Sequence, residues 1–595
     1  MRAEVNPAPD TPDPGSSGWQ RHWPVGVVLA AAAFLLFAGL GRDYLWADEG
    51  DTAILAESIL KFGVPTAWDG VTLIDSDYGA RLNDDFVMVS HPWLQYYLTA
   101  ASFALFGEST LAARVPFAVL GLLTIVLVYA TVLRVTQHRW TAASAAVLLT
   151  LSVQFLLYSR QSRNYSLSAA LTCLLVFQFL RMNSWRGAFG FATIAILLFH
   201  SHPIAVAPLA ALGVLTLAYR PFQVQRRWFW IAMTMVVPFT LPWLFMAERG
   251  YREQTGVIAS AGQLLPRLAQ YAVEVASVTS VVGAIVIGAV LLRRRARLPQ
   301  PAARRGKPVR RHVVAIFTDD ERRLLAIVAA IVASFAVAMA VTQPRDVIWS
   351  VGLRYTSAVL PLMAMTLALL TARVSSGNPR VWVALLLVLG FTKFGRLTPW
   401  TFWERPAALR DPAAIVAFHN PDHWVDRLLR TEQIAFVSSL FERNVGTSGQ
   451  VIEFLKTHAK PADIVVTNYG WESLYFHTNL PQGLTVLPTY PIYRAARDQG
   501  LPDYVFSADR ARWIVWRQAW GAYRGQAIDR VLAQLKEGKI PVFQVATFPE
   551  TLWENRENVH YRRFPGRRYI YPWYENVPST VVYRVDWEKT PLGGE

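Results

Sequence analysis

Acidic and basic side chains gather at a few places in this chain, where long apolar segments end. Three carboxylates, Asp48, Glu49 and Asp51, follow the first apolar segment. The basic and tyrosine side chains at comparable positions are His91, Arg114, Arg160, Arg163, Tyr165, His200, His202, Arg345, Arg354 and Tyr355. A carboxylate can act as a general base toward a hydroxyl or amine. Arginine and histidine can stabilise the charge that develops on a phosphate leaving group.

These positions suit chemistry on a charged head group that carries an apolar tail. Charges inside a bilayer are costly, and the apolar segments have almost none near their centres. A transporter would place polar groups near the bilayer midplane, in interrupted helices. The pattern instead indicates a site at the outer membrane boundary, of the kind that handles a polyprenyl-phosphate sugar.

The segments that position these residues are predicted to be membrane helices. Of 595 residues, 53% are hydrophobic and 17% are charged, which excludes an ordinary soluble protein. We expect about eleven spans, because each apolar stretch is long enough to cross a bilayer. They lie near residues 24–41, 112–134, 140–158, 165–181, 186–200, 202–219, 228–246, 271–292, 324–342, 355–373 and 380–397.

Basic residues in alternate loops predict the orientation of these spans. Arginines flank the connections near 134–139, 181–186, 220–227 and 373–380, and eleven Lys/Arg lie between Arg293 and Arg323. Such loops are cytoplasmic, so the loop 42–111 and everything after residue 397 are expected outside. After residue 397 the chain is nearly neutral, with 23 Lys/Arg and 21 Asp/Glu, so the excess positive charge lies in the loops between apolar segments. The net charge of +16 therefore indicates membrane topology and not nucleic-acid binding.

The loop 42–111 is predicted to carry two interfacial helices. Ten Asp/Glu lie between Asp43 and Asp85, and the whole loop holds three Lys/Arg. One helical pattern ends in Gly63; the other begins near Pro92 and closes at Gly107. The Pro-, Gly- and Ser-rich residues 1–23 are expected to be a disordered cytoplasmic segment.

Beyond residue 397 the pattern becomes that of a soluble α/β domain, residues 398–595. Residues 449–459 and 527–537 have helical periodicity, and the apolar runs 463–468, 512–516 and 579–585 are typical of strands. The predicted fold is thus a polytopic α-helical membrane domain, residues 24–397 with a basic cytoplasmic loop at 293–323, followed by an outer α/β domain.

The predicted chemistry on a polyprenyl-phosphate sugar requires no cofactor. The chain has no phosphate-cradling glycine motif, and the spacing of His200 and His202 is weak support for a metal site. Its single cysteine, Cys173, lies in an apolar stretch and excludes an intrachain disulfide.

Five segments occur in the order expected for one family. They are WADEGDTAILAESIL, HPWLQYYLTAASFALFG, AARVPFAVLGLLTIVLVY, SRQSRNYSL and RYTSAVLPL. Together they resemble the GT-C glycosyltransferases, in the branch of protein O-mannosyltransferases and lipid A aminoarabinose transferases. The likeness is best over residues 24–220, and VVTNYGWESLYFHTNLP is similar to outer C-terminal domains of the family.

The resemblance implies roles for particular residues. Asp48 would be the catalytic carboxylate that orients or deprotonates the acceptor, with Glu49 beside it. The residues expected to bind the lipid phosphate or sugar are His91, Arg160, Arg163, Tyr165, His202, Arg354 and Tyr355. This chain departs from the aminoarabinose branch, which has an arginine where Asp51 stands and a lysine where His91 stands, so that branch's phosphate contacts and sugar do not carry over directly.

We therefore predict a glycosyltransferase of the bacterial inner membrane. It would move one monosaccharide from a polyprenyl-phosphate donor to a lipid, glycan or protein acceptor on the outer face, with inversion, because one base and a direct displacement suffice. Two other classes stay open: a lipid-linked sugar flippase or transporter, and a non-catalytic envelope assembly or receptor subunit. An oligosaccharide ligase would use the same chemistry.

Overall fold

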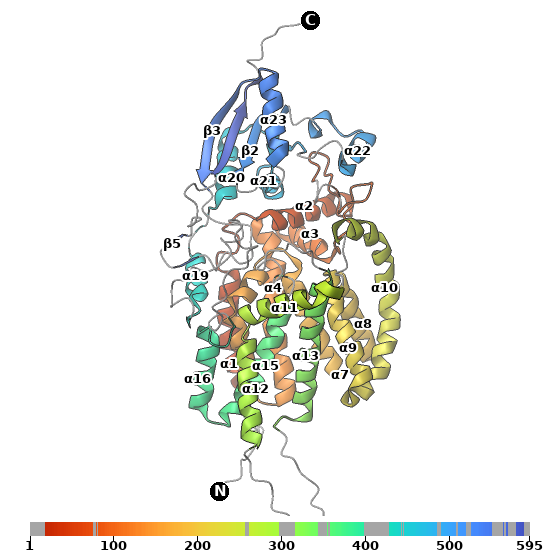
Figure 1. Cartoon of the computed structure of the whole chain (residues 1–595), viewed down its shortest axis with the longest axis vertical. Coiled ribbons are helices and arrows are strands. Elements are labelled where there is room, and N and C mark those ends of the chain that lie inside the picture. The colour runs from red at the N-terminus through yellow and green to blue at the C-terminus, as the bar shows by residue number, and fades with distance from the viewer. Residues whose placement is uncertain are drawn as a thin grey trace, which may run out of the picture.

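The structure is a computed structural model of the chain. It describes residues 18–74, 79, 81–255, 261–296, 316–342, 354, 357–397, 428–441, 443, 445–484, 490–506, 510–518, 525–549, 563–564, 567–568 and 579–587. The described residues form a helical bundle with an α/β region at one end (Figure 1). The predictions for residues 1–17, for Arg345 and for Tyr355 lie outside the described residues.

Apolar helices make up the bundle. They are α1 (Gly18–Phe37), α4 (Thr110–Thr136), α5 (Arg139–Thr150), α6 (Val153–Ser159), α7 (Asn164–Arg181), α8 (Trp185–Phe199), α9 (Ala207–Ala218), α10 (Gln223–Thr255), α11 (Ala261–Val278), α12 (Val281–Ala296), α13 (Asp319–Thr342), α15 (Val359–Ser375) and α16 (Pro379–Phe391). The 3-10 turns η1 (Pro203–Val206) and η2 (Arg220–Phe222) flank α9. By length and composition, α4 and residues 319–341 of α13 can each cross a bilayer.

Two predicted spans are broken in the structure. The stretch 140–158 forms α5 and α6, which meet at 71° and together could make one further span. Ser152 ends the straight run, because its side chain accepts a hydrogen bond from the main chain of Phe155 and so starts a new helix. The stretch 271–292 is likewise divided between α11 and α12, where the Gly283 N–H donates to the carbonyl of Gly395.

The basic connections lie at the end of the bundle opposite the acidic loop. Helix α4 begins beside Glu49, to which Arg114 is paired, and runs to Arg134. Helix α7 begins next to Ser162, which also binds Glu49, and runs to Arg181. A single helix therefore separates each of these arginines from the acidic loop, as the predicted topology requires.

The acidic loop contains both predicted helices. Helix α2 (Ala47–Phe62) ends at Gly63, whose φ of 80° is the left-handed geometry that glycine adopts at low cost. Helix α3 (Leu94–Phe106) ends at Gly107. Figure 1 shows both helices lying across the end of the bundle, below the C-terminal region. Most of α2 is buried, so it is enclosed between other elements of the protein.

The C-terminal region is built on a mixed four-stranded sheet of order β1-β2-β6-β3. Its strands are β1 (Val465–Thr467), β2 (Trp513–Arg517), β3 (Val542–Pro549) and β6 (Ser579–Val585). Strand β1 runs parallel to β2, and β6 is antiparallel to both β2 and β3. The two-residue strands β4 (Arg563–Phe564) and β5 (Arg567–Arg568) form a separate pair.

Helices cover both faces of this sheet. Successive side chains of β2 point to opposite faces, and apolar residues on each face pack against a helix. Trp513 and Val515 pack with α20 (Thr447–His458) and α21 (Trp471–Thr478). Ile514 points to the other face and packs with α23 (Gly525–Glu537). The predicted helices 449–459 and 527–537 and the three predicted strands are confirmed. The remaining elements are α19 (Thr431–Ser439), α22 (Pro491–Asp498) and η5 (Asp503–Val505).

Candidate active site

Helix α2 starts with two adjacent carboxylates in different surroundings. Trp46 is the N-cap, so Asp48 and Glu49 lie in the first turn, where the helix dipole favours negative charge. Successive side chains on a helix point about 100° apart. One carboxylate can therefore enter the protein while its neighbour faces the site.

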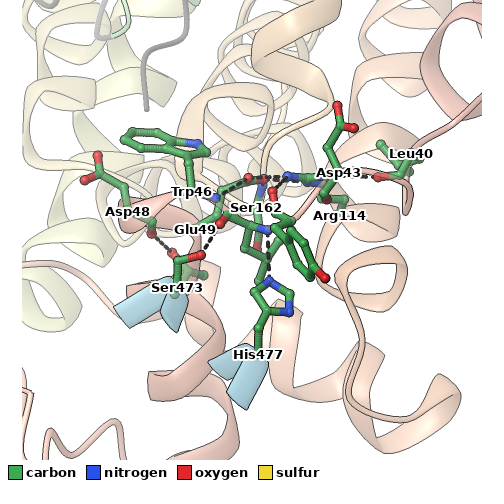
Figure 2. A network of polar contacts seen from close by, with 12 residues as sticks. Leu40, Asp43, Trp46, Asp48, Glu49, Arg114, Ser162, Ser473 and His477 are labelled. Carbon is green, nitrogen blue, oxygen red and sulfur yellow. Dashed lines mark hydrogen bonds and ion pairs between the residues drawn. The ribbon is translucent and has the colours of Figure 1, made fainter. Parts of the chain in front are cut away.

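Glu49 is the inward carboxylate and is fully buried. Its two oxygens lie 2.6 and 2.8 Å from Nη2 and Nε of Arg114, and Oε1 also accepts the Ser162 N–H at 2.8 Å. Arg114 donates further to three carbonyl oxygens, those of Leu40, Asp43 and Tyr44. Figure 2 shows this network. Glu49 thereby ties α2 to the end of α1, to α4 and to the segment before α7.

Asp48 is the outward carboxylate, and in Figure 2 it points away from the Glu49 network. Its Oδ2 lies 3.1 Å from Nη1 of Arg354 and 3.8 Å from Nη2 of Arg163. Its side chain is 33% exposed, against 9% for Arg163 and 17% for Arg354. A carboxylate is thus presented to the outside by two guanidinium groups that are themselves mostly covered.

Arg163 lies at the centre of the charged cluster, immediately before α7. Its Nη1 donates to the main-chain carbonyl of Asp48 at 3.1 Å and to Thr52 Oγ1 at 3.3 Å, and lies 3.9 Å from Asp51 Oδ2. Burial alone would lower the pKa of Arg163, but nearby groups, Asp48 foremost, give a net rise. For Asp51, burial raises the pKa while Arg163 and Arg81 oppose that rise.

His91 and His202 belong to the same cluster. Burial is the main cause that lowers the pKa of each, to about 3 for His202, and the charges of Arg163 and Arg354 lower both further. Both rings are therefore neutral at pH 7. His91 Nδ1 lies 2.9 Å from Ser90 Oγ. The charges of Arg163 and Arg354 therefore act on both histidines as well as on the Asp48 carboxylate.

Arg160 has a different set of partners. It donates three hydrogen bonds of 2.8–2.9 Å to the carbonyls of Leu35, Leu36 and Ala38, at the end of α1. The guanidinium also lies over the Phe436 ring. These contacts favour a structural role at the end of α1, and a phosphate contact for Arg160 stays a prediction.

Tyr165 is buried in the first turn of α7 and packs against the ring of Tyr158. Its main-chain carbonyl accepts from Ser357 Oγ, which brings the start of α15 to the start of α7. The structure therefore brings Arg354, just before α15, to the end of the bundle that holds Asp48. His200 lies nearby and its main-chain carbonyl accepts from Leu94 N–H.

Two members of this cluster were not singled out from the sequence. Arg81 acts electrostatically on Asp51 and His91, and Thr52 binds Arg163. The available signal for Arg81 was its charge, as one of three Lys/Arg in a loop rich in carboxylates. Thr52 carried no signal, because its role depends on Arg163, which is distant in the sequence. Among the described residues, no group of three His, Cys, Asp or Glu side chains is placed to hold a metal ion.

Comparisons with known proteins agree with this geometry. Residues 90–246 match the sequence model of the dolichyl-phosphate-mannose-protein mannosyltransferase family. No curated protein matches the chain by sequence. Two crystal structures of ArnT from Cupriavidus metallidurans share its fold. The complex with undecaprenyl phosphate has a TM-score of 0.54 at 14% identity, covering 95% of this chain and 98% of that one. The apo structure has a TM-score of 0.52 at 15% identity, covering 89% and 96%.

A third match is to the structure of the S. cerevisiae protein O-mannosyltransferase Pmt1-Pmt2 complex bound to the sugar donor. This match covers 41% of this chain and 35% of that chain, at 14% identity. Its TM-score of 0.30 is too low to support an argument. The family match and the ArnT fold together confirm the resemblance predicted from the sequence: this membrane protein has the fold of the GT-C glycosyltransferases, with residues 90–246 matching their mannosyltransferase family.

Proposed function

We propose that this protein transfers one sugar from a polyprenyl-phosphate donor to an acceptor on the outer face of the bacterial inner membrane. The observation that carries the proposal is the setting of Asp48. It is a partly exposed carboxylate beside two mostly covered arginines, at the end of the bundle opposite the basic connections. Undecaprenyl phosphate is bound by ArnT, whose fold the chain shares, and this supports a donor of that chemical class.

In the proposed reaction, the Asp48 carboxylate accepts the proton of an acceptor hydroxyl or amine. The acceptor atom then bonds to the anomeric carbon of the sugar, and the bond from that carbon to the phosphate oxygen breaks. The phosphate leaves with the electron pair of that bond. A single displacement of this kind inverts the anomeric centre and needs one base.

Arg163 and Arg354 are the proposed ligands of the donor phosphate. Both guanidinium groups face Asp48, at 3.8 and 3.1 Å. A bound phosphate competes for these donors, because charge-assisted hydrogen bonds to phosphate are strong. Binding of the donor would then free the Asp48 carboxylate for the acceptor. Neutral His91 and His202 can each offer an N–H to the phosphate or the sugar without adding charge.

Asp51 is the second carboxylate of the site. It is buried, and burial raises its pKa. Its position on α2 makes it the next candidate for the catalytic carboxylate should Asp48 be dispensable.

The proposed topology places residues 24–397 in the membrane and residues 398–595 outside the cytoplasm. It is supported by the basic connections at one end of the bundle and the C-terminal α/β region at the other. A cytoplasmic α/β region would remove the proposal, because α21 contacts the acidic loop directly.

The test is a comparison of envelope glycolipids and glycoproteins by mass spectrometry. A deletion strain should lose a monosaccharide from one acceptor class, and the wild-type chain should restore it. The chain with Asp48→Asn should be made at the normal level and fail to restore it. An unchanged envelope in the deletion strain contradicts the proposal.

A further inference from the structure

Two side chains from the C-terminal region hold the residue that leads into helix α2. Leu45 is 1% exposed and lies directly before the N-cap. Its N–H donates to Nε2 of His477 at 3.0 Å, and its carbonyl accepts from the Ser473 hydroxyl. The N–H and the C=O of Leu45 are thus both hydrogen-bonded to residues of the C-terminal region, which lie 432 and 428 positions further along the chain (Figure 2).

Gly50 allows this approach. A Cβ at Gly50 would lie 2.6 Å from the main-chain nitrogen of Ser473 and 2.8 Å from the carbonyl carbon of Glu472. Both obstructing atoms belong to the backbone of α21, so they cannot rotate away as a side chain could. Helix α21 therefore rests directly on the first turns of α2, between the two carboxylates at its start and Asp51.

Other residues of α21 contact the same acidic loop, residues 42–111. Tyr475 donates from its hydroxyl to Oδ2 of Asp69 at 2.5 Å. The Phe476 ring stacks on Phe103 of α3, with centroids 6.0 Å apart. Residues 473–477 of α21 thus contact the start of α2, the loop that follows α2, and α3.

We propose that α21 is a positioning element, through which Ser473 and His477 set the place of the Asp48 carboxylate relative to Arg163 and Arg354. The inference rests on the proposed function of Asp48 and assigns a role to the C-terminal region. The direction of support is fixed by the contacts: Glu49 and Arg114 hold α2 from the bundle side, and α21 holds it from the outer side. A buried N–H and C=O that lose their partners must find others, and the chain before α2 can do so only by moving.

The hydrogen bond from Leu45 also fixes the protonation state of His477. Its Nε2 must be an acceptor, and burial, with Lys456 and Arg114, lowers the pKa of His477 to about 3. The contact is therefore independent of pH over the neutral range. Glutamine can place an amide oxygen near the position of Nε2, whereas leucine offers no acceptor.

The experiment compares full-length variants in the deletion strain at matched expression. His477→Leu and Gly50→Ala should lower the envelope modification by about ten- to a hundredfold, because misplacing a reacting group by about 1 Å has effects of this size. His477→Gln should restore most of the activity. Thr478→Ala, on the same helix but with its hydroxyl bonded to Leu474 and Leu480 of the C-terminal region itself, is the matched control and should behave as wild type.

Undecaprenyl phosphate binding to each purified variant, measured by native mass spectrometry, separates positioning from folding. Binding should stay close to wild type in His477→Leu and Gly50→Ala. Equal loss of activity in His477→Leu and His477→Gln, with loss of binding, would overturn the inference in favour of a merely structural role. Normal modification by His477→Leu and Gly50→Ala, beside an inactive Asp48→Asn, overturns the inference and leaves the proposed function intact. An active Asp48→Asn overturns the inference together with the catalytic role of Asp48, and leaves Asp51 as the candidate carboxylate.

Discussion

The neighbouring carboxylates Asp48 and Glu49 should respond oppositely to replacement by their amides. Asp48→Asn keeps the size of the side chain and removes the proton acceptor. Glu49→Gln removes the charge opposite Arg114, in a site where the glutamate is fully buried and the arginine nearly so. The first change should stop the reaction in a folded protein, and the second should destabilise the protein.

The magnitudes follow from the exposure of the two groups. Loss of a general base typically costs about a hundredfold or more in rate, or about 2.7 kcal/mol of transition-state stabilisation. The ion pairs of Asp48 are partly exposed, and such pairs contribute about 0–1 kcal/mol to stability. Breaking a buried ion pair by removing one partner costs about 3–5 kcal/mol. Glu49→Gln should therefore lower the thermal stability far more than Asp48→Asn.

The assay combines two measurements on each variant. Initial rates of envelope modification are compared in the deletion strain at matched expression, and thermal unfolding is followed on the purified proteins in detergent. Glu57→Gln, on the same helix, is the control. Burial, then Glu108, raises the pKa of Glu57 to about 8, so Glu57 is mostly protonated at pH 7 and glutamine resembles it closely. A near-normal rate for Asp48→Asn, or a Glu49→Gln protein as stable as wild type, would refute the reasoning.

Three further predictions concern the site and its orientation. Arg163→Ala and Arg354→Ala should each weaken binding of undecaprenyl phosphate by about ten- to over a hundredfold, since a charge-assisted hydrogen bond contributes about 1.5–3 kcal/mol. Arg160→Ala should change thermal stability more than binding, and equal losses of binding in all three variants, measured by calorimetric titration of the purified proteins, would contradict the assignment. Because the folded-state pKa of Glu57 is raised from 4.5 to about 8, its contribution to stability is present below pH 4.5 and declines as the pH rises toward 8. Wild type should therefore lose more thermal stability than Glu57→Gln between pH 5 and pH 8, and melting temperatures that change in parallel for the two proteins would contradict this. Reporter fusions after residue 300 should behave as cytoplasmic and fusions after residue 400 as periplasmic, and the opposite pattern would invert the proposed topology.

Local patterns were sufficient to place most elements. Helix α2 could be predicted because its apolar periodicity ends in Gly63, and β2 because its β-branched and aromatic residues form a short run. The broken span at α5 and α6 could not, because the apolar run continues through Ser152 and only a cap marks the new helix. The division of 271–292 depends on a contact between Gly283 and Gly395, which no local pattern reports.

The candidate site shows the same limit. Residue type and position at helix ends predicted Asp48, Arg163 and Arg354 as site residues, and the structure places both arginines within 4 Å of the Asp48 carboxylate. Residue type and position alone did not distinguish Glu49 from Asp48, and only the family resemblance assigned them different roles, since the structural difference arises from Arg114, 65 residues away. The sequence could not predict that α2 is enclosed by α21 either, because Gly50 resembles any glycine inside a helix until its neighbours are known.

The two attachments of α2 become available at different times during biosynthesis. Among the described residues, the partners of Glu49 lie within the first 162 residues of the chain, so this attachment can form while the ribosome is still translating the later helices. The partners of Leu45 are residues 473 and 477 and emerge only near the end of translation. Chains truncated before β1 would therefore insert with an assembled bundle but an unanchored α2. The proposed site would therefore reach the geometry described above only once synthesis is almost complete, and the nascent chain would carry it in an incomplete form throughout its insertion.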